Sequence, residues 1–460
     1  MPLPLAFILP VILLTEGFAS IAIEVLTIRQ LLPVAGGSII VTSLVIGFFL
    51  LSLAIGYQQG GKQHRHPRQV LRRNFFIAAC WLGIGLSYVF ILLFFYSIEK
   101  LLGSHILYPL IIYLFLIIAP LVYLLGQTIP IAMNMVKQTE SAGKIGGNAL
   151  GLSTLGSFLG ATLTTLFLMY YFGVGTSVLI TSLLLFLLTL LLTETRAAFL
   201  LQLFLISIAT MIIYEFNTAF EKKIFLLTDP YANYQIITAP RAHLSENEKI
   251  LMINEAPSSY INAAKKTFPY NEKIKQVLFN ELKLRRANIL ILGAGGFTLS
   301  AENTYQNTFT YVDIDKSITK AVIPHFMQAI NGSFIADDAR HFVKSTDKYY
   351  DAIVIDAYTD TKAIPSYLLT QEYMMDIKSR LATKGTAIFN ILANPQLTDL
   401  YSKHVDNTIR AVFKNCMVLP EHYTNQITNI LYLCSNSLNQ ADTMVYKDNF
   451  NHSTTDAFYW

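Results

Sequence analysis

Charged residues are scarce in this sequence. Asp, Glu, Lys and Arg make up 14% of its 460 residues, whereas 53% are hydrophobic. The scarcity is greatest before about residue 216, and the rest has the composition of an ordinary globular protein. The net charge of +4 is scattered, without a basic stripe interleaved with aromatic residues. This pattern argues against nucleic-acid binding and indicates at least two domains, the first of them apolar.

Cysteine is also rare, with three residues, too few for a framework of disulfides. Cys80 lies in an apolar segment, and Cys416 and Cys434 lie in two late predicted strands. These last two could pair if their domain lay outside the cell, but buried free thiols are the favoured interpretation. No cluster of His, Cys and Asp has the spacing of metal ligands, so no metal is expected.

Long apolar segments, in contrast, are abundant. A membrane-spanning helix needs roughly 20 apolar residues. Seven segments before residue 216 are about that long: 4–28, 38–59, 74–97, 105–127, 148–172, 174–193 and 197–214. The first follows no basic region, which argues against a cleavable signal peptide. We therefore predict a multi-pass α-helical membrane domain of about seven helices over residues 1–215.

The loops between these segments predict their orientation. Five Lys or Arg residues lie in the loop 61–73, and Lys137 and Lys144 follow the fourth segment. The loops on the other side hold only Arg29 and Lys100. Because basic loops stay cytoplasmic, we expect an inner-membrane protein with a cytoplasmic N-terminus. An odd number of helices then favours a periplasmic C-terminal domain.

Two features inside the apolar segments predict contacts in the protein interior. Glu16 and Glu24 are eight residues apart, and so lie on nearly the same face of a helix. Carboxylates at this depth are usually paired or functional, and Glu24 could pair with Arg29. Gly156 and Gly160 are four residues apart, a spacing that predicts close helix packing.

The second half contains a glycine-rich turn between a strand and a helix. The apolar run 289–292 ends in the turn Gly293–Gly296, and the residues from Phe297 onward are predicted to begin a helix. Glycines let a backbone approach a ligand, and a helix N-terminus offers unpaired N–H groups. Asp313 ends the next run twenty residues after Gly293, where a carboxylate can accept the hydroxyls of a ribose.

Two more acidic residues end later runs. Asp338 precedes a helix predicted from Ala339, and it could accept a hydrogen bond from an adenine amino group or cap the helix. Asp356 ends the run "AIVID". Since ligands gather at the carboxyl ends of parallel strands, Asp356 should face the same crevice as the glycine turn. There it could take a proton from an attacking amine.

Further runs complete the predicted fold. "LATKGTAIFNILAN" supplies a fifth strand, and "NCMVLPEH" with "ITNILYLCSN" suggests a closing hairpin. We expect an α/β Rossmann-like, nucleoside-binding domain over residues 286–460. A small β-rich subdomain should precede it over residues 225–285.

These motifs resemble the spermidine synthases, which are polyamine aminopropyltransferases with a class I methyltransferase-like fold. The closer resemblance is to the membrane-fused spermidine synthase-like proteins. It covers about residues 225–437 in the soluble half. It also includes the first apolar segment, "GFASIAIEVLTIRQLLPVAGGS", and the stretch "IDAYTDTKAIPSYLLTQEY".

The resemblance implies a binding site for an S-adenosyl donor. Asp313 would hold the ribose and Asp338 the adenine, beside Gly293 and Gly295 of the turn. Gln235, in "NYQII", would contact the nucleoside. The implied co-substrate is decarboxylated S-adenosylmethionine or a related compound, with no permanently bound cofactor.

The resemblance also implies an acceptor site for a small amine or polyamine. Asp356 would be the general base that activates the amine, and Tyr270, in "PYNE", would line its channel. Polyamine-making members have an Asp where this chain has Gly296, and their second acid follows the catalytic Asp by three residues, whereas Asp360 follows by four. Both departures weaken amine binding. A homodimer is compatible with the resemblance.

Three functions stay open from the sequence. The chain could be an aminopropyltransferase, or it could transfer another group from an S-adenosyl compound to a membrane or periplasmic acceptor. It could also be a non-catalytic sensor or transporter that binds a nucleoside or polyamine. S-adenosyl compounds are made in the cytosol, which favours a cytoplasmic C-terminal domain and opposes the indication from the loops. The side of this domain therefore stays open.

Overall fold

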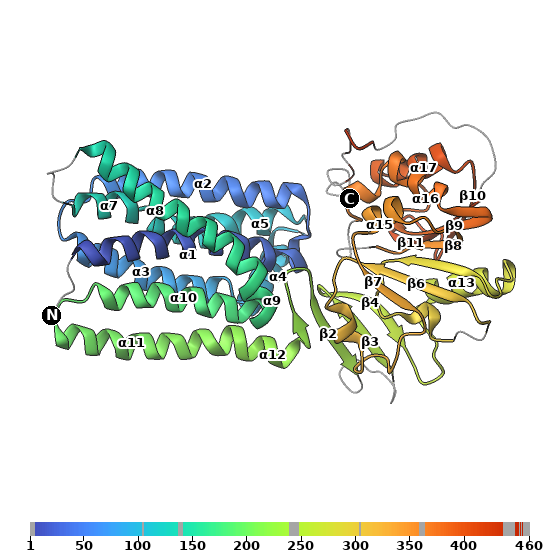
Figure 1. Cartoon of the computed structure of the whole chain (residues 1–460), viewed down its shortest axis with the longest axis horizontal. Coiled ribbons are helices and arrows are strands. Elements are labelled where there is room, and N and C mark those ends of the chain that lie inside the picture. The colour runs from blue at the N-terminus through green and yellow to red at the C-terminus, as the bar shows by residue number, and fades with distance from the viewer. Residues whose placement is uncertain are drawn as a thin grey trace. The chain divides into compact units, whose positions relative to one another are not determined.

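The chain divides into two compact units, as seen in a computed structural model (Figure 1). Residues 1–35 and 39–231 form a mainly helical unit, and residues 36–38 and 232–460 form an α/β unit. The structure describes residues 5–103, 105–136, 141–238, 248–302, 305–357, 364–435, 447–449, 451 and 453.

The first unit is a bundle of apolar helices. Six helices or helical runs in its described part are long and apolar enough to cross a membrane, and a bent pair, α3 and α4, makes seven if it is one crossing. The elements are α1 (Leu5–Ala35), α2 (Ile39–Gly61), α3 (Pro67–Gly85), α4 (Tyr88–Leu102), α5 (Leu107–Tyr113), η1 (Leu114–Ile118), α6 (Ala119–Gly126), α7 (Thr128–Asn134), α8 (Ala142–Leu163), η2 (Thr164–Leu168), α9 (Met169–Phe172), α10 (Val174–Leu191), α11 (Arg196–Tyr214), η3 (Glu215–Ala219), α12 (Phe220–Ile224) and the short strand β1 (Leu227–Thr228).

The predicted helix 74–97 is wrong as a single element. The chain bends by 69° between α3 and α4. Ser87 caps α4, since its hydroxyl accepts a hydrogen bond from the N–H of Phe90 at 3.4 Å. Hydropathy is continuous across this position, so only the capping serine marks the break. The last helical run also extends to Ile224, beyond the end of the segment 197–214.

The helices α1 and α8 pack backbone to backbone. A Cβ atom added to Gly156 would lie 2.0 Å from the carbonyl oxygen of Leu14, and one added to Gly160 would lie 2.3 Å from that of Phe18. The predicted close packing of these glycines is confirmed. Glu16 is buried in the same interface, where its carboxylate accepts hydrogen bonds from the hydroxyls of Ser20 (2.8 Å) and Ser153 (3.1 Å).

The second unit contains an antiparallel sheet and a larger mixed sheet. The antiparallel sheet includes β2 (Asn233–Thr238), β3 (Lys249–Ile253) and β4 (Ala256–Ile261). The larger sheet has the order β7-β6-β5-β8-β9-β11-β10. Its strands are β5 (Asn288–Leu292), β6 (Thr308–Asp313), β7 (Ser333–Ala336), β8 (Tyr350–Ile355), β9 (Leu381–Ala393), β10 (Asn415–Pro420) and β11 (Thr428–Ser435).

The pairing of these strands confirms the expected Rossmann-like domain. β7, β6, β5, β8 and β9 are parallel, and β11 and β10 close the sheet as an antiparallel hairpin. The connecting elements are α13 (Pro269–Gln276), η4 (Val277–Glu281), η5 (Thr298–Ser300), α14 (Ile318–Val322), α15 (Ala339–Ser345), η6 (Ser366–Leu368), α16 (Gln371–Ser379) and α17 (Leu400–Val412).

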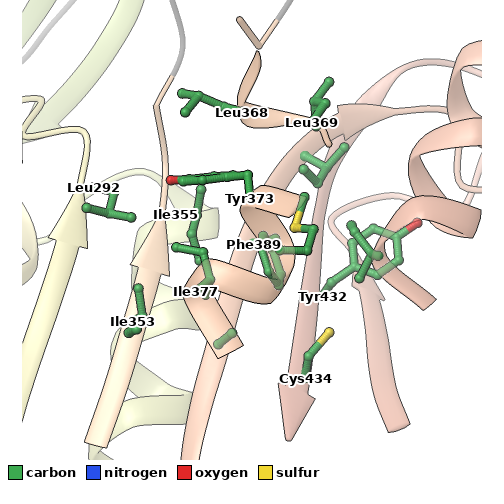
Figure 2. Close-up of a cluster of buried hydrophobic side chains, with 14 of the residues drawn as sticks. Leu292, Ile353, Ile355, Leu368, Leu369, Tyr373, Ile377, Phe389, Tyr432 and Cys434 are labelled. Carbon is green, nitrogen blue, oxygen red and sulfur yellow. The ribbon is translucent and has the colours of Figure 1, made fainter. Parts of the chain in front are cut away.

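A hydrophobic core joins this sheet to α15, α16 and α17 (Figure 2). Alternate residues of a strand point to the same face, so Ile353 and Ile355 of β8 both enter this core. They pack in one cluster with Tyr373 and Ile377 of α16. Burying each such side chain contributes about 1.5–3 kcal/mol. The core thus holds the strands in register and places the carboxyl ends of β5, β6 and β8 at one edge.

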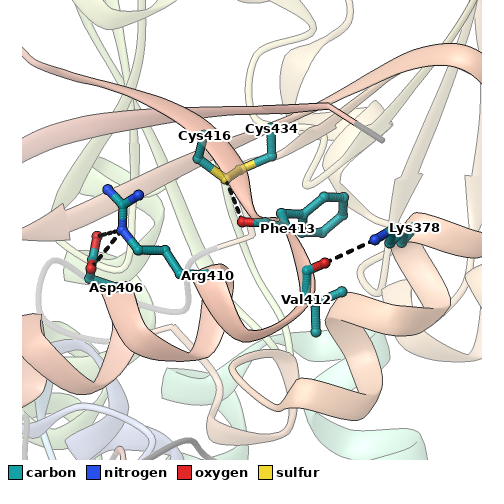
Figure 3. Close-up of a disulfide and its surroundings, with 7 residues drawn as sticks. All are labelled: Lys378, Asp406, Arg410, Val412, Phe413, Cys416 and Cys434. Carbon is teal, nitrogen blue, oxygen red and sulfur yellow. Dashed lines mark hydrogen bonds and ion pairs between the residues drawn. A yellow bond between two sulfur atoms is a disulfide. The ribbon is translucent and has the colours of Figure 1, made fainter. Parts of the chain in front are cut away.

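Cys416 and Cys434 form a disulfide (Figure 3). They lie directly opposite each other on β10 and β11, and Cys434 belongs to the hydrophobic core. The favoured interpretation of two free thiols is therefore wrong. Strand register decides the pairing, and the sequence indicated a hairpin without its register. Cys80 is a free thiol.

Candidate active site at the strand ends

Asp356 directly follows β8 and lies against the glycine turn. Its N–H donates a hydrogen bond to the carbonyl of Leu292 at 2.8 Å. Gly293 has φ +95°, and a Cβ atom added there would lie 2.2 Å from the carbonyl oxygen of Asp356. Only glycine fits both the left-handed backbone and this contact. The structure thus brings the turn and Asp356 together, as the strand-end argument predicts.

Two side chains hold the carboxylate of Asp356. The Asn390 Nδ2 donates to its Oδ1 at 2.8 Å, and the Tyr270 hydroxyl lies 3.4 Å from its Oδ2. Burial raises the pKa of Asp356, and these two hydrogen bonds partly oppose the rise. Burial, with the nearby Asp356 charge, raises the pKa of Tyr270 well above its usual value. The phenol therefore stays protonated and can donate to the carboxylate.

Asn390 is a site residue that the sequence interpretation missed. It lies on β9 and is 3% exposed. Its signal was a polar residue inside the apolar run "AIFNILA" of a predicted central strand. A buried amide needs a hydrogen-bond partner, and here the partner is the carboxylate that follows the neighbouring strand.

Side chains of the domain accept hydrogen bonds from the glycine turn. The N–H of Ala294 donates to the Oδ2 of Asp313 at 2.9 Å, and the N–H of Gly296 donates to the Oγ of Ser259 at 2.8 Å. The predicted helix after the turn is wrong for the described residues, which contain only the 3₁₀ turn η5. Phe297 adopts a left-handed backbone (φ 57°) with its ring fully buried, so Phe297 itself is not an α-helical residue.

Asp313 is oriented at the end of β6 by two backbone groups. Its Oδ2 accepts from Ala294, and its Oδ1 accepts from the N–H of Asp315 at 3.0 Å. Charge-assisted hydrogen bonds of this kind fix a carboxylate firmly. Asp313 therefore lies beside the glycine turn, as predicted. Its contact with a ribose stays a prediction.

Asp338 caps α15. Its Oδ1 accepts from the N–H groups of Arg340 (3.0 Å) and His341 (2.9 Å), and its Oδ2 accepts from the hydroxyl of Tyr367 (2.7 Å). The capping interpretation is confirmed, and the contact with adenine stays a prediction. The structure does not bring Gln235 into hydrogen-bonding contact with the strand-end residues among those it describes. Gln235 is half-buried on β2.

Gly296 has no room for a side chain. A Cβ atom there would lie 2.5 Å from Cε1 of Phe326 and 2.8 Å from Cβ of Ser259, both of which are buried. An acid cannot occupy this place without moving the ring of Phe326. Asp360, the second departure from the family pattern, lies outside the described residues. In the described part of the chain, no group of three His, Cys, Asp or Glu side chains could hold a metal.

Part of the α/β unit is similar to a known family. Residues 267–442 match the family model of the spermine/spermidine synthase domain. Asp356, Tyr270, Asn390 and the glycine turn all lie within the matched range.

Two proteins that are similar to this part of the chain are polyamine aminopropyltransferases. That of Sulfolobus acidocaldarius is 30% identical over 194 residues, which cover 37% of this chain and 64% of the relative. That of Vibrio vulnificus is 30% identical over 155 residues, which cover 32% of this chain and 49% of the relative. The chain thus spans less than two thirds of either protein.

Among solved structures, a probable spermidine synthase from Corynebacterium glutamicum is similar to this chain with a TM-score of 0.39 at 18% identity. The similarity covers 46% of this chain and 79% of that one.

Proposed function

We propose that the protein is a membrane-bound transferase of the aminopropyltransferase type. It moves an alkyl group from an S-adenosyl donor, such as decarboxylated S-adenosylmethionine, to a small amine or polyamine. The observation that carries the proposal is the half-buried carboxylate of Asp356, held by Asn390 and Tyr270 against the glycine turn. The match to the synthase domain over residues 267–442 supports it.

The proposed reaction is a direct displacement at carbon. The nitrogen lone pair of the amine forms a bond to the carbon attached to the sulfonium sulfur. That carbon–sulfur bond breaks, and its electron pair stays on sulfur, which leaves as a neutral thioether. The proton lost by the amine passes to Asp356, whose raised pKa suits a general base. Tyr270 orients the carboxylate and lines the amine site.

The proposed donor site surrounds the glycine turn. Asp313 binds the ribose hydroxyls beside Gly293 and Gly295, and Asp338 and Gln235 contact the adenine and the rest of the nucleoside. The N–H groups of Ala294 and Asp315 orient the carboxylate of Asp313. This supports its role in binding the ribose, because a carboxylate that is already fixed loses little conformational entropy on binding. No tightly bound cofactor is part of the proposal, and a homodimer stays a prediction.

The helical unit is proposed to cross the inner membrane several times, with its N-terminus in the cytoplasm. The length and apolarity of its helices support this placement. The basic loop 61–73 supports the orientation.

A second candidate function follows from Gly296. Phe326 and Ser259 fill the space where polyamine-making relatives place an acid for the amino group of the donor. A donor bound without that acid could carry a different group. Transfer of another group from an S-adenosyl compound to a membrane or periplasmic acceptor is therefore the alternative.

The decisive experiment is an assay of the purified full-length protein. Incubation with putrescine and decarboxylated S-adenosylmethionine should yield spermidine and methylthioadenosine in equal amounts, measured by mass spectrometry. Nucleoside binding without either product, across a panel of amines, would favour the second candidate or a non-catalytic binding protein.

Replacing Asp313 with Ala should weaken the binding of methylthioadenosine by about 1.5–3 kcal/mol, the cost of losing a charge-assisted hydrogen bond. Isothermal calorimetry measures the change. Asp351→Asn is the matched control. Asp351 is the second residue of β8, and its carboxylate accepts from the N–H of Asn288, at the opposite end of the strands. Equal affinity in the Asp313 variant and the wild type would refute the assignment.

Replacing Asn390 with Leu should move the acid limb of the activity profile to higher pH. The N–H of Asn390 stabilises the ionised form of Asp356, so its removal raises the pKa of that carboxylate further. Asp356 must be ionised to accept a proton. Activity should therefore be lost at a pH about 1–2 units higher, given 1.36 kcal/mol per unit and the strength of such a bond.

The pH dependence of kcat/KM measures this shift. Thr386→Val is the control, since Thr386 is a buried polar residue of the same strand that pairs with the start of β8. A uniform loss of activity in Asn390→Leu, without a shift in pH, would assign Asn390 a purely structural role.

A further inference from the structure

Side-chain contacts within the helical unit show which helix ends lie together. Asn134, at the end of α7, donates to the carbonyl of Gln63 at 3.2 Å. Arg68, in the first turn of α3, lies 3.7 Å from Glu194, which follows α10. The loops after α2, α7 and α10 therefore lie at one end of the bundle, here named the basic end. Its described loop residues are 62–66, 135–136, 141 and 192–195.

Other contacts define the opposite end. Arg29, near the end of α1, donates from Nε to the carbonyl of Asp229 at 2.6 Å. Gln30 donates from Nε2 to the carbonyl of Leu86 at 3.0 Å, where α3 gives way to α4. The break between α3 and α4 and the segment after α12 thus lie at the end of the bundle that is remote from the basic end.

These contacts settle how the bent pair is counted. α3 starts at the basic end and reaches the opposite end at Leu86, and the run from Leu107 returns to the basic end at Asn134. The chain therefore traverses the bundle once between Pro67 and Leu107. The traverses number seven in the described part of the unit, so the last one ends opposite the basic end.

The basic residues gather at the end where α1 begins. Leu9 and Leu13 of α1 pack in one cluster with Ile129 and Ala132 of α7, which places the start of α1 near the basic end. The described Lys and Arg residues at or next to the three loops of this end are Lys62, Arg65, Arg68, Arg72, Arg73, Lys144 and Arg196. In a membrane, the end that is rich in Lys and Arg stays cytoplasmic.

The disulfide of the synthase domain is an independent observation. It joins the edge strand β10 to β11, with Phe413 at the end of α17 beside it (Figure 3). Disulfides persist in oxidising compartments, whereas the cytosol keeps thiols reduced. The indication of an oxidising compartment that the disulfide gives depends on neither the loop charges nor the number of helices.

We infer that the spermine/spermidine synthase domain lies on the extracytoplasmic, oxidising side of the membrane. The seven traverses, the basic end and the disulfide all lead to the same side. The inference rests on the proposed membrane insertion and not on the proposed reaction. As a consequence, the amine acceptor and the S-adenosyl donor are taken from that side or delivered to it through the membrane.

Two cysteine variants of the full-length protein test on which side of the membrane this domain lies. Lys384→Cys places a thiol on an exposed position of the synthase domain, and Glu194→Cys places one at the basic end. Both carry Cys80→Ser to remove the free thiol. In cells with an intact inner membrane, a membrane-impermeant maleimide should label Lys384→Cys at once and Glu194→Cys only after lysis. The reverse pattern would overturn the inference.

Thiol counting tests the disulfide in the same Cys80→Ser background. Protein trapped in acid from growing cells and denatured should show no alkylated cysteine without reductant and two after reduction. Two alkylated cysteines before reduction would overturn the oxidising-side assignment. Turnover of the purified protein in detergent does not depend on the side of the domain, so failure of this inference and failure of the proposed function are distinguishable.

Discussion

Replacing Asp356 with Asn is expected to lower turnover by about a hundredfold or more, the scale of a lost general base. The amide has the shape of the carboxylate and can still accept from Asn390 or Tyr270, but it cannot take the proton of the amine. Binding of methylthioadenosine should change little, because the nucleoside is assigned to Asp313 and the glycine turn. Single-turnover kinetics and calorimetry measure the two quantities separately.

Asp351→Asn is the matched control for this variant. Asp351 lies at the start of β8, five residues before Asp356, and its carboxylate accepts a hydrogen bond from the backbone of β5. The substitution is chemically identical but lies at the other end of the strand, so turnover should stay near that of the wild type. If both variants lose activity equally, the loss reflects damage to the sheet. If neither does, Asp356 is not the base.

Much of the α/β unit was predictable, because its information is local. Each parallel strand is an apolar run of a few residues, and the acid after it, such as Asp313 or Asp356, lies at the carboxyl end by the geometry of the fold. A glycine at position 293 is also expected from the turn, because its left-handed backbone is one that other residues rarely adopt. Contact between the turn and Asp356 follows from pairing β5 with β8, which any sheet of this order requires.

What the sequence did not reveal depends on residues that meet across the fold. Asn390 is a site residue only because β9 pairs with β8 and directs the amide at Asp356. The disulfide depends on the register that sets Cys416 opposite Cys434. The short 3₁₀ turn after the glycines depends on the burial of Phe297, which packs edge-to-face against Tyr311. Local propensity contains none of these contacts.

Replacing Gly293 with Ala is expected to damage both the site and the fold. The left-handed backbone at φ +95° is strained for any other residue, and the new methyl group would lie 2.2 Å from the carbonyl oxygen of Asp356. Backbone strain and overpacking each cost about 1–3 kcal/mol, so the free energy of unfolding should fall by about 3 kcal/mol or more. Displacing Asp356 by about 1 Å should also lower turnover by about a hundredfold.

Gly295→Ala separates these two causes. Gly295 also has a left-handed backbone, at φ +48°, but an added Cβ atom would meet only the hydroxyl oxygens of Ser259 at 3.1 Å and Ser258 at 3.4 Å. The Ser259 Oγ accepts from the N–H of Gly296 and needs to move by only a few tenths of an ångström. This variant should therefore lose mainly the roughly 1–2 kcal/mol of left-handed strain. Chemical denaturation measures both stabilities, and kcat reports the position of Asp356. Equal losses of kcat in the two variants would mean that strain in the turn, and not contact with Asp356, makes Gly293 necessary. A larger loss in Gly293→Ala would show that the glycine turn positions the general base as well as approaching the nucleoside.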